Sequence, residues 1–398
     1  MRILVAEDEQ ETRGRLQRCL ESAGHEVVCV GDGAEAHELL ERDPAVSLLI
    51  AAWRMPQVDG VELCRRIRSA NHRRYLPIIL LPSDRERQQL IEGLDAGADA
   101  FVRKPVDGAE VLAQIRVAER ILRLQDRLEA QLLYLSQARD RLEKDLWAAA
   151  EVQRSLLPSE LPSIPGLEFA WVYDACDLVG GDMFNVVRLD EHRVGLYVLD
   201  VSGHGTSAAL LSVSLSRVLT PFPQQGGILK RTGPEPPFYE LVPPAEVAGE
   251  LNRRFQLITQ SGQYFTFLYA ILDVRTRELR YVRAGHPPLI QVGSHGAQLR
   301  EVGGGVPIGV TEDAEYRDET LQLCEGDLVL AYTDGVNEAR SPDDEEFGTG
   351  RMLDLLIERR KNGSGVADTV QALRKAIEEF RGGTRPRDDV TMVGLGVR

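Results

Sequence analysis

Several features that would narrow the function of this 398-residue chain are missing from its sequence. No uninterrupted apolar run approaches the roughly 20 residues that a membrane-spanning helix requires, so we expect no membrane partner. The first residues, M-R-I-L-V, run directly into an acidic cluster and lack the basic and apolar regions of a secretory signal. These absences predict a cytoplasmic protein.

Cysteine is rare, and positive charge is in deficit. The five cysteines are odd in number, scattered and without metal-binding spacing, which predicts buried free thiols rather than disulfides or a catalytic nucleophile. The formal net charge is −15, and no basic tract is long enough to form a nucleic-acid footprint. We therefore expect no nucleic-acid partner.

Glycine and proline are absent between Gly108 and Pro158, although the whole chain contains 36 glycines and 20 prolines. This segment is rich in Leu, Ala, Arg, Glu and Gln, which favour a continuous helix. Apolar residues recur in it at every seventh position, namely Ile121, Leu128, Leu135, Leu142, Ala149 and Leu156. Such a heptad pattern predicts a coiled coil and hence a parallel homodimer. The alternative is a single amphipathic helix that lies against its own domain.

The length predicts a multidomain chain with two domains and a connector. We place the first domain at residues 1–118, the helical coiled-coil linker at 119–158 and the second domain at 159–398. In the first domain, apolar strand patterns alternate with helix patterns. This alternation predicts an α/β, doubly wound domain whose parallel strands carry functional residues at their C-terminal ends.

The first domain resembles a two-component receiver domain. The resemblance rests on the acidic pair Glu7 and Asp8 after the first strand, the loop W-R-M-P-Q-V-D-G at residues 53–60, and the tripeptide R-K-P that contains Lys104. In that family, a phosphoacceptor aspartate stands just before the loop. This chain has Ala52 there, which has no oxygen to phosphorylate or to bind Mg²⁺.

The fourth strand also departs from the receiver pattern, because Pro82 replaces the hydroxyl residue that usually follows it. The resemblance therefore implies a degenerate receiver pocket, or pseudo-receiver, which acts by binding a partner or by dimerising. A phosphorylation-switched output would need an acceptor that Ala52 does not provide. The pocket residues are Glu7, Asp8, Ala52 and Lys104.

Four aspartates of the second domain lie next to predicted strands: Asp182, Asp200, Asp334 and Asp388. Carboxylates that gather in a place of low dielectric constant raise one another's pKa unless a cation neutralises them. Oxygen ligands without a His/Cys cluster favour a hard ion such as Mg²⁺ or Mn²⁺. The alternative for each aspartate is that it caps a turn or a helix.

Five motifs of this domain occur in the order of a known family. They are V-G-G-D at residues 179–182, D-V-S-G-H-G at 200–205, A-G-H-P at 284–287, Y-T-D-G at 332–335 and D-D-V-T at 388–391. Together they resemble the bacterial PPM-type serine phosphatases, the SpoIIE/RsbU-like branch of the PP2C-like enzymes, over roughly residues 148–398. The resemblance implies an α+β fold in which a β-sandwich is flanked by helices.

The resemblance also implies a site for two Mn²⁺ or Mg²⁺ ions. Asp200 would bridge them, while Asp182 and the backbone carbonyl of Val201 would complete one ion's protein ligands. Asp334 and Asp388 would hold the other ion. Asp200 and Asp182 are therefore the predicted catalytic residues.

Other polar residues near the motifs are assigned lesser roles. Asp389 is the nearest alternative to Asp388, whereas His204 and His286 are interpreted as structural. Residues 220–244 contain seven prolines and are predicted to form a mobile surface excursion.

The function that the resemblance implies is a metal-dependent protein serine/threonine phosphatase regulated by the receiver-like domain. Its substrate would be a phosphoserine STAS-domain anti-anti-sigma protein in a partner-switching pathway. No covalent enzyme intermediate is implied. The alternative is a non-catalytic dimeric signalling scaffold with a phosphatase-like fold, against which the presence of all four aspartates argues.

Overall fold

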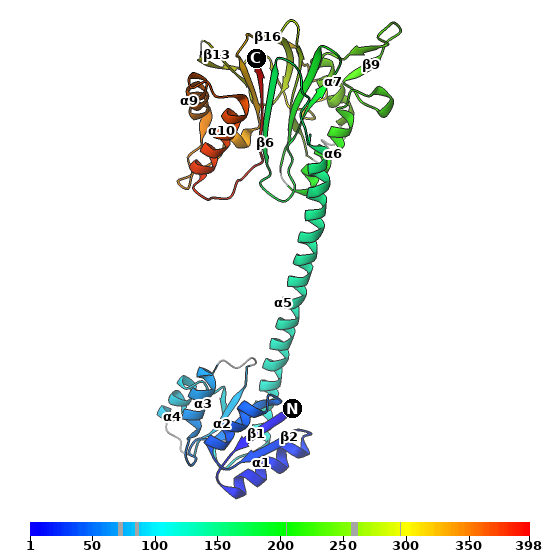
Figure 1. Ribbon diagram of the computed structural model, residues 1–398. Helices are drawn as coiled ribbons and strands as arrows, with labels where there is room; N and C mark the ends of the chain where they lie inside the picture. Colours follow the sequence, from blue (N-terminus) through cyan, green and yellow to red (C-terminus); the bar gives the residue numbers. More distant parts are fainter. Residues whose placement is uncertain (71–74, 84–86, 204, 256–261, 295) are drawn as a thin grey trace. The chain divides into compact units, whose positions relative to one another are not determined.

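The computed structural model describes residues 1–70, 75–83, 87–203, 205–255, 262–294 and 296–398 (Figure 1). The chain divides into one unit at Met1–Arg139 and another at Asp140–Arg398. The division falls inside one long helix, so the boundaries at 118 and 158 stay a prediction. Within the described residues, no helix is both long and apolar enough to cross a membrane.

The first unit is a five-stranded parallel sheet with helices on both faces, as predicted. Its three central strands, β1, β3 and β4, are short apolar runs that are buried on both sides, which is typical of parallel sheets. The strand order is β2-β1-β3-β4-β5. The elements are β1 (Arg2–Ala6), α1 (Gln10–Ser22), β2 (Glu26–Val30), α2 (Gly33–Arg42), β3 (Val46–Ala52), α3 (Gly60–Ser69), β4 (Ile78–Leu81), α4 (Arg87–Asp95) and β5 (Ala100–Phe101).

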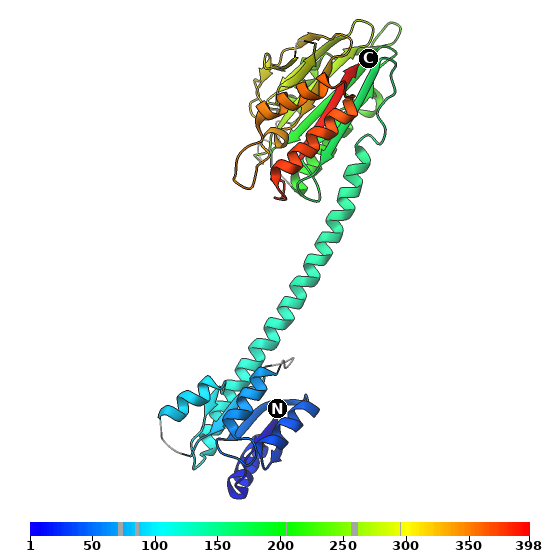
Figure 2. The same cartoon turned by 60° about the vertical axis from the view of Figure 1, so that its left-hand side comes forward.

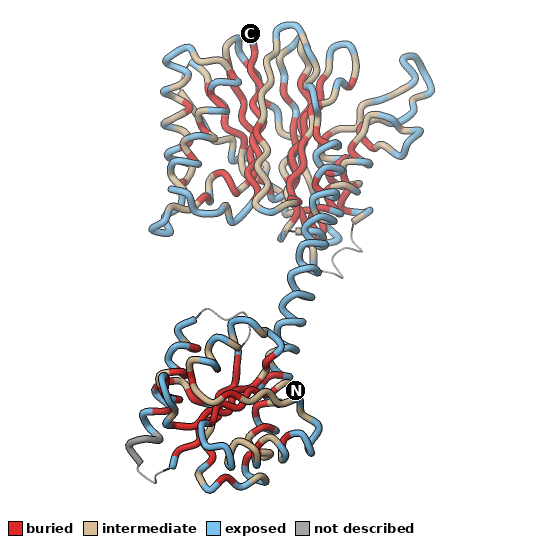
Figure 3. The backbone as a smooth tube through the Cα atoms, turned by 60° about the horizontal axis from the view of Figure 1, so that its bottom comes forward, coloured by how far each residue is buried: buried red, intermediate tan, exposed pale blue. Residues whose placement is uncertain are grey.

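Helix α5 (Gly108–Leu156) covers the predicted connector without interruption. Its first turns bury Val111 and Ile115 in the core of the first unit, and near its end Ala150 packs with Val179 and Ala209. In its middle, the tube of Figure 3 is almost entirely exposed. The predicted helix is confirmed. The heptad leucines in its middle are exposed, which argues against the alternative in which the helix buries them against its own domain.

The second unit contains two main sheets that pack against each other. One has the order β15-β12-β11-β8-β7, with β16 also paired to β12, and the other has the order β14-β13-β17-β18-β6. The strands are β6 (Leu167–Asp174), β7 (Met183–Arg188), β8 (Arg193–Val201), β11 (Phe265–Asp273), β12 (Glu278–Ala284), β13 (Leu289–Gly293), β14 (Gly296–Arg300), β15 (Gly304–Gly305), β16 (Glu319–Gln322), β17 (Leu328–Tyr332) and β18 (Val390–Val397).

Helices cover the outer faces of this sandwich. Helices α6 (Thr206–Val218) and α7 (Pro244–Phe255) share the core of the first sheet, and α9 (Gly348–Lys361) and α10 (Val366–Arg381) share that of the second. Figure 2 shows α10 lying over β18. The predicted β-sandwich flanked by helices is therefore present. A short helix, α8 (Asp334–Asn337), follows β17.

Two predictions about less regular parts of the chain need correction. Residues 220–244 include a one-turn 3₁₀ helix, η1 (Pro223–Gln225), and a hairpin of β9 (Lys230–Thr232) and β10 (Tyr239–Leu241). The buried side chain of Leu229 anchors this hairpin in the core. The cysteines are free as predicted, but only Cys64 is buried and Cys324 is exposed.

Candidate active site

The four predicted metal-binding aspartates lie at one end of the sandwich. Strands β7 and β8 are antiparallel with Met183 opposite Leu199, a register that places Asp182 opposite Asp200. In the other sheet, Tyr332 of β17 pairs with Met392 of β18, so Asp334 after β17 lies near Asp388 before β18. In an antiparallel pair, the C-terminus of one strand lies beside the N-terminus of its neighbour. Residues from distant parts of the sequence are thus brought together at one end of the sandwich.

Asp182 is buried, with 1% of its surface exposed, and is held by the second sheet. The hydroxyl groups of Thr333 and Thr391 donate hydrogen bonds of 2.8 and 2.6 Å to its Oδ2 atom. Both threonines follow or belong to strands of the sheet that does not contain β7. The carboxylate of Asp182 therefore ties the two sheets together at the site. Both threonines lie within the motifs Y-T-D-G and D-D-V-T, but no role was predicted for either of them.

Asp389 holds the loop before β7 rather than facing outward. Its carboxylate accepts backbone hydrogen bonds from Cys176 at 2.8 Å, Gly181 at 2.6 Å and Asp182 at 3.3 Å. The neighbouring Asp388 is exposed, and its Oδ1 atom accepts from the Asp389 amide at 2.8 Å. This arrangement favours Asp388 as the metal ligand and makes Asp389 a positioning residue.

The aspartates strongly perturb one another. Burial raises the pKa of Asp200 to about 8, and the charges of Asp334, Asp388 and Asp389 contribute to the increase. Burial and then Asp200 raise the pKa of Asp182 well above its usual range. Burial also raises the pKa of Asp334 to about 6, with Asp388 as the next cause. Such a cluster is stabilised by bound positive charge.

The donor set fits a hard divalent cation, because it consists of carboxylate oxygens and a backbone carbonyl. A Cβ atom at Gly181 would lie 2.8 Å from the Val201 carbonyl oxygen, so glycine allows this oxygen to come close to the Asp182 loop. In the described part of the chain, no three Asp, Glu, His or Cys side chains converge closely enough to surround an ion. A cation would therefore have to draw them together. His204 lies outside the described residues.

His286 is buried beside this end of the first sheet. A hydrogen bond of 2.7 Å joins its Nδ1 atom to Oγ1 of Thr266, which pairs across the sheet with Asp200. Burial, with the nearby Arg283, lowers the pKa of His286 to about 3. The imidazole is therefore neutral near pH 7, and its contacts favour the structural interpretation.

Gln153, near the end of α5, forms hydrogen bonds to the loop that precedes Asp182. Its Nε2 atom donates to the Gly180 carbonyl at 2.6 Å and to the Ser212 hydroxyl at 3.1 Å, and the Gly180 amide donates back to Oε1 at 3.1 Å. Only 4% of its surface is exposed. The sequence signal for this role was the glutamine of V-Q-R-S-L-L-P, which was not assigned to the site.

Replacing this glutamine should loosen the loop that carries Asp182. We expect Gln153→Ala to speed hydrogen exchange of the Gly180 and Gly181 amides by roughly tenfold or more, because buried polar groups left unpaired cost about 1–3 kcal/mol. Hydrogen–deuterium exchange of the full chain measures this. Gln137→Ala, at an exposed position of the same helix, is the control. Unchanged protection in Gln153→Ala would show that the contact does not support the loop.

The receiver-like pocket contains a buried ion pair. Lys104 Nζ lies 2.8 Å from Oε1 of Glu7, which is fully buried, whereas Asp8 is exposed. Burial raises the pKa of Glu7, although Lys104 acts to lower it. Ala52 ends β3 and is buried. The structure therefore brings Glu7 and Lys104 together at the C-terminal edge of the sheet, where the position of Ala52 supplies only a methyl group.

These features define the class of protein. A two-sheet sandwich with aspartates from both sheets gathered at one end is the PP2C-like, or PPM-type, phosphatase fold, and a receiver-type domain precedes it. The SiaA-PP2C domain of Pseudomonas aeruginosa has this fold, with a TM-score of 0.53 and 21% identity over 66% of this chain and 99% of that domain.

The chain belongs to the SpoIIE family (Stage II sporulation protein E), which matches residues 190–398, and the response regulator receiver domain matches residues 3–116. Phosphoserine phosphatase RsbP of Bacillus subtilis is 28% identical over 64% of this chain and 58% of its own length. Response regulator MprA of Mycobacterium leprae is 38% identical over 33% of this chain and 56% of its own length. The chain thus spans little more than half the length of these curated relatives.

Proposed function

We propose that the chain is a metal-dependent protein serine/threonine phosphatase regulated by its N-terminal receiver-like domain. The observation that carries the proposal is the placement of Asp182, Asp200 and Asp334 at the shared end of two sheets, where burial raises the pKa of each carboxylate. A non-catalytic scaffold has no need to bear the cost of burying such a cluster. Membership of the SpoIIE family and similarity to a protein named phosphoserine phosphatase support the same conclusion.

In this proposal each residue has a separate task. Asp200 would contribute to both cations, with Asp182 and the Val201 carbonyl completing the ligands of one and Asp334 and Asp388 holding the second. Two Mn²⁺ or Mg²⁺ ions would supply positive charge that neutralises the phosphoryl oxygens and lowers the pKa of water. The threonine hydroxyl groups and Asp389 keep the Asp182 loop in place before any ion binds.

The test is hydrolysis of p-nitrophenyl phosphate and of a phosphoserine protein by the full chain. Hydrolysis should require added Mn²⁺ or Mg²⁺ and should stop with EDTA. A phosphorylated STAS-domain anti-anti-sigma protein is the substrate that we propose, by analogy with the family's partner-switching pathways. Absence of cation-dependent hydrolysis on every substrate would favour the scaffold alternative.

The exposed heptad residues of α5 support a parallel homodimer as the active assembly. Leu128, Leu135 and Leu142 are 57%, 61% and 60% exposed, and burying leucine side chains in a coiled-coil seam stabilises it by about 1.5–3 kcal/mol each. The dimer would give the receiver-like domain a route to influence the end of α5, where Gln153 contacts the loop before Asp182.

A charge placed in the seam should separate the protomers. We expect Leu135→Glu to convert the chain from dimer to monomer at micromolar concentration, because two buried carboxylates would face each other. Size-exclusion chromatography with light scattering measures the mass. Leu133→Glu is a matched control, since Leu133 is equally exposed at 61% but lies outside the heptad positions. A wild-type chain that is already monomeric would contradict the dimer.

The receiver-like domain should not accept a phosphoryl group. With Ala52 at the acceptor position and Lys104 paired to Glu7, incubation with acetyl phosphate and Mg²⁺ should leave the mass of the chain unchanged. Intact-mass spectrometry checks this directly. An added phosphoryl group that maps to an aspartate of residues 1–118 would restore the phosphorylation-switched alternative.

A further inference from the structure

A cavity of about 280 Å³ opens next to the aspartate cluster and is lined by arginines. Gly335 and Asp388 form the wall that it shares with the candidate active site. Its other walls include four arginines and two acidic residues, namely Arg340, Arg381, Arg385, Arg387, Glu338 and Asp344. We refer to this cavity as the arginine hollow. Such a concentration of guanidinium groups is notable in a chain with a net charge of −15.

The end of α10 gives the hollow its shape. Gly382 ends this helix with a positive φ of 57°, and a Cβ atom there would lie 2.9 Å from Cγ of Pro342. The chain can therefore reverse direction tightly against the loop that contains Pro342. This reversal places Arg381 beside that loop, in the wall of the hollow.

Two of the four arginines already have acidic partners. Arg340 contacts Glu346 at 2.6 Å and Asp344 at 3.4 Å, and Arg387 contacts Asp344 at 2.9 Å. Asp344 is thus engaged by both of these arginines. Among the described residues, Glu338 forms no ion pair with Arg381 or Arg385, so these two guanidinium groups are available to a ligand.

Arg381 has donors that lack acceptors. Its Nε and Nη1 atoms are shut off from solvent and have no hydrogen-bond partner among the described residues. An arginine in the last turn of a helix often caps the helix carbonyls, but these two nitrogens do not. Within the described part of the chain, Arg385 also has no ion pair, and it is exposed at the rim. Buried N–H groups without acceptors are costly, so a turn of the Arg381 side chain towards an oxyanion in the hollow would recover that cost.

We propose that the arginine hollow binds an oxyanion of the protein substrate, next to the phosphorylated residue that the aspartate cluster receives. The proposal rests on the proposed phosphatase function and adds a specificity site to it. The planar guanidinium group pairs with carboxylate and phosphate oxygens alike, so the bound group is an acidic side chain or a second phosphorylated one. Because Asp388 lines both sites, one substrate segment can reach both.

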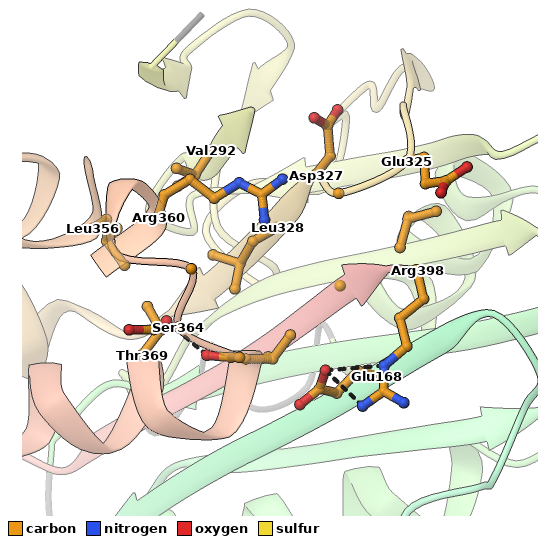
Figure 4. A pocket seen from close by; sticks show the side chains of 16 residues that line it. Glu168, Val292, Glu325, Asp327, Leu328, Leu356, Arg360, Ser364, Thr369 and Arg398 are labelled. Atoms are coloured by element: carbon orange, nitrogen blue, oxygen red, sulfur yellow. Dashed lines mark hydrogen bonds and ion pairs between the residues drawn. The ribbon is translucent and has the colours of Figure 1, made fainter. Parts of the chain in front are cut away.

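A second cavity, of about 320 Å³, lies at the opposite end of β18 and does not have this character (Figure 4). There Arg398 is paired with Glu168 at 3.0 Å. The buried Asp327 accepts from Gln291 at 2.7 Å and from the Cys324 amide at 3.0 Å. The side chains of Arg398, Glu168 and Asp327 are thus satisfied within the protein. Arg360, which is exposed on its wall, provides a matched control for arginine substitution.

The experiment compares three phosphoserine peptides with the full chain and Mn²⁺. One carries glutamates on both sides of the phosphoserine, one carries glutamines there, and one carries a second phosphoserine. In the wild type, kcat/KM should be about tenfold higher for the glutamate or doubly phosphorylated peptide than for the glutamine peptide. Arg381→Gln and the more exposed Arg385→Gln should each bring this ratio towards one through KM, whereas Arg360→Gln should preserve it.

The arginine variants also identify the source of the oxyanion. It is a carboxylate if kcat/KM falls more for the glutamate peptide, and a phosphate if it falls more for the doubly phosphorylated peptide. Ratios that stay the same in correctly folded Arg381→Gln and Arg385→Gln chains would overturn the proposal. Binding provides an independent readout, because fluorescence anisotropy of the labelled peptides can be measured in the Asp200→Asn background without turnover. If the wild type hydrolyses none of the peptides but binding still depends on Arg381 and Arg385, the proposed phosphatase function is wrong and the proposal of an oxyanion site in the arginine hollow is retained.

Discussion

Asp200→Asn should reduce hydrolysis of a phosphoserine substrate on the order of a thousandfold or more. Asp200 is the carboxylate at the end of β8 that faces Asp182 and is perturbed by Asp334 and Asp388, so it lies between the two predicted pairs of ligands. An amide keeps the shape but removes the negative charge that both cations would share. The loss should appear in kcat, with a parallel loss of Mn²⁺ affinity in calorimetry.

A matched control lies in the same strand pair. Asp190 is in the turn between β7 and β8, at the end opposite the site, and its Oδ2 atom pairs with Arg193 at 2.7 Å. Asp190→Asn should change the rate by less than about threefold. If Asp200→Asn keeps substantial cation-dependent activity while Asp190→Asn behaves normally, the assignment of Asp200 as the bridging ligand is wrong.

The result also separates the phosphatase from the scaffold. A scaffold would bind its partner equally well with aspartate or asparagine at position 200, and would show no cation-dependent turnover to lose. The two proposals therefore predict opposite results for the same pair of variants. Retained partner binding with no turnover in the wild type is the result that only the scaffold predicts.

Local patterns in the sequence were sufficient for the elements that are regular. The alternating strands and helices of residues 1–118, the glycine-free helix and the strands beside the motifs all follow from periodicity and from turn residues. The strand patterns also predicted that Asp182, Asp200, Asp334 and Asp388 lie at or next to strand termini, where the structure has them. The grouping of the four acids at one edge came from the family resemblance.

The contacts that hold the site could not be read in the same way. Thr333 and Thr391 reach Asp182 across more than 150 positions of sequence, and Asp389 reaches the Gly181 amide across 208. No local pattern encodes which distant backbone group an aspartate will accept from. The same reason explains why no contact with the Asp182 loop was predicted for Gln153. The β13–β14 hairpin was missed because short strands next to glycines give weak signals.

The metal-free chain should become less stable as pH rises, which is the opposite of the usual behaviour of paired carboxylates. The pKa of Asp200 is raised from 3.8 to about 8 and that of Asp334 to about 6, so between pH 4 and 8 the folded state holds more protons than the unfolded state. Stability changes with pH in proportion to protons bound by the unfolded state minus those bound by the folded state. This difference is negative here, so stability is lost as pH rises towards 8.

The expected loss for the second unit between pH 5.5 and 8 is on the order of 3 kcal/mol, or roughly 10 °C in Tm. Thermal unfolding in EDTA measures it. Asp200→Asn has no charge to bury, so it should flatten the dependence and unfold at a higher temperature than the wild type at pH 8. Asp190→Asn should instead destabilise the chain at pH 8, because burial there is outweighed by hydrogen bonds from His192 and Arg193 that lower the pKa of Asp190.

Added Mn²⁺ should reverse the pH trend in the wild type alone. Cation binding requires ionised carboxylates, so the stabilisation of the folded chain by Mn²⁺ grows as pH rises. This is the pH range in which the metal-free chain is least stable. In Asp200→Asn the same addition should change Tm little. A metal-free wild type whose Tm rises between pH 5.5 and 8 would mean that the aspartates do not repel one another as their burial requires, and the physical basis for a two-cation site would be lost.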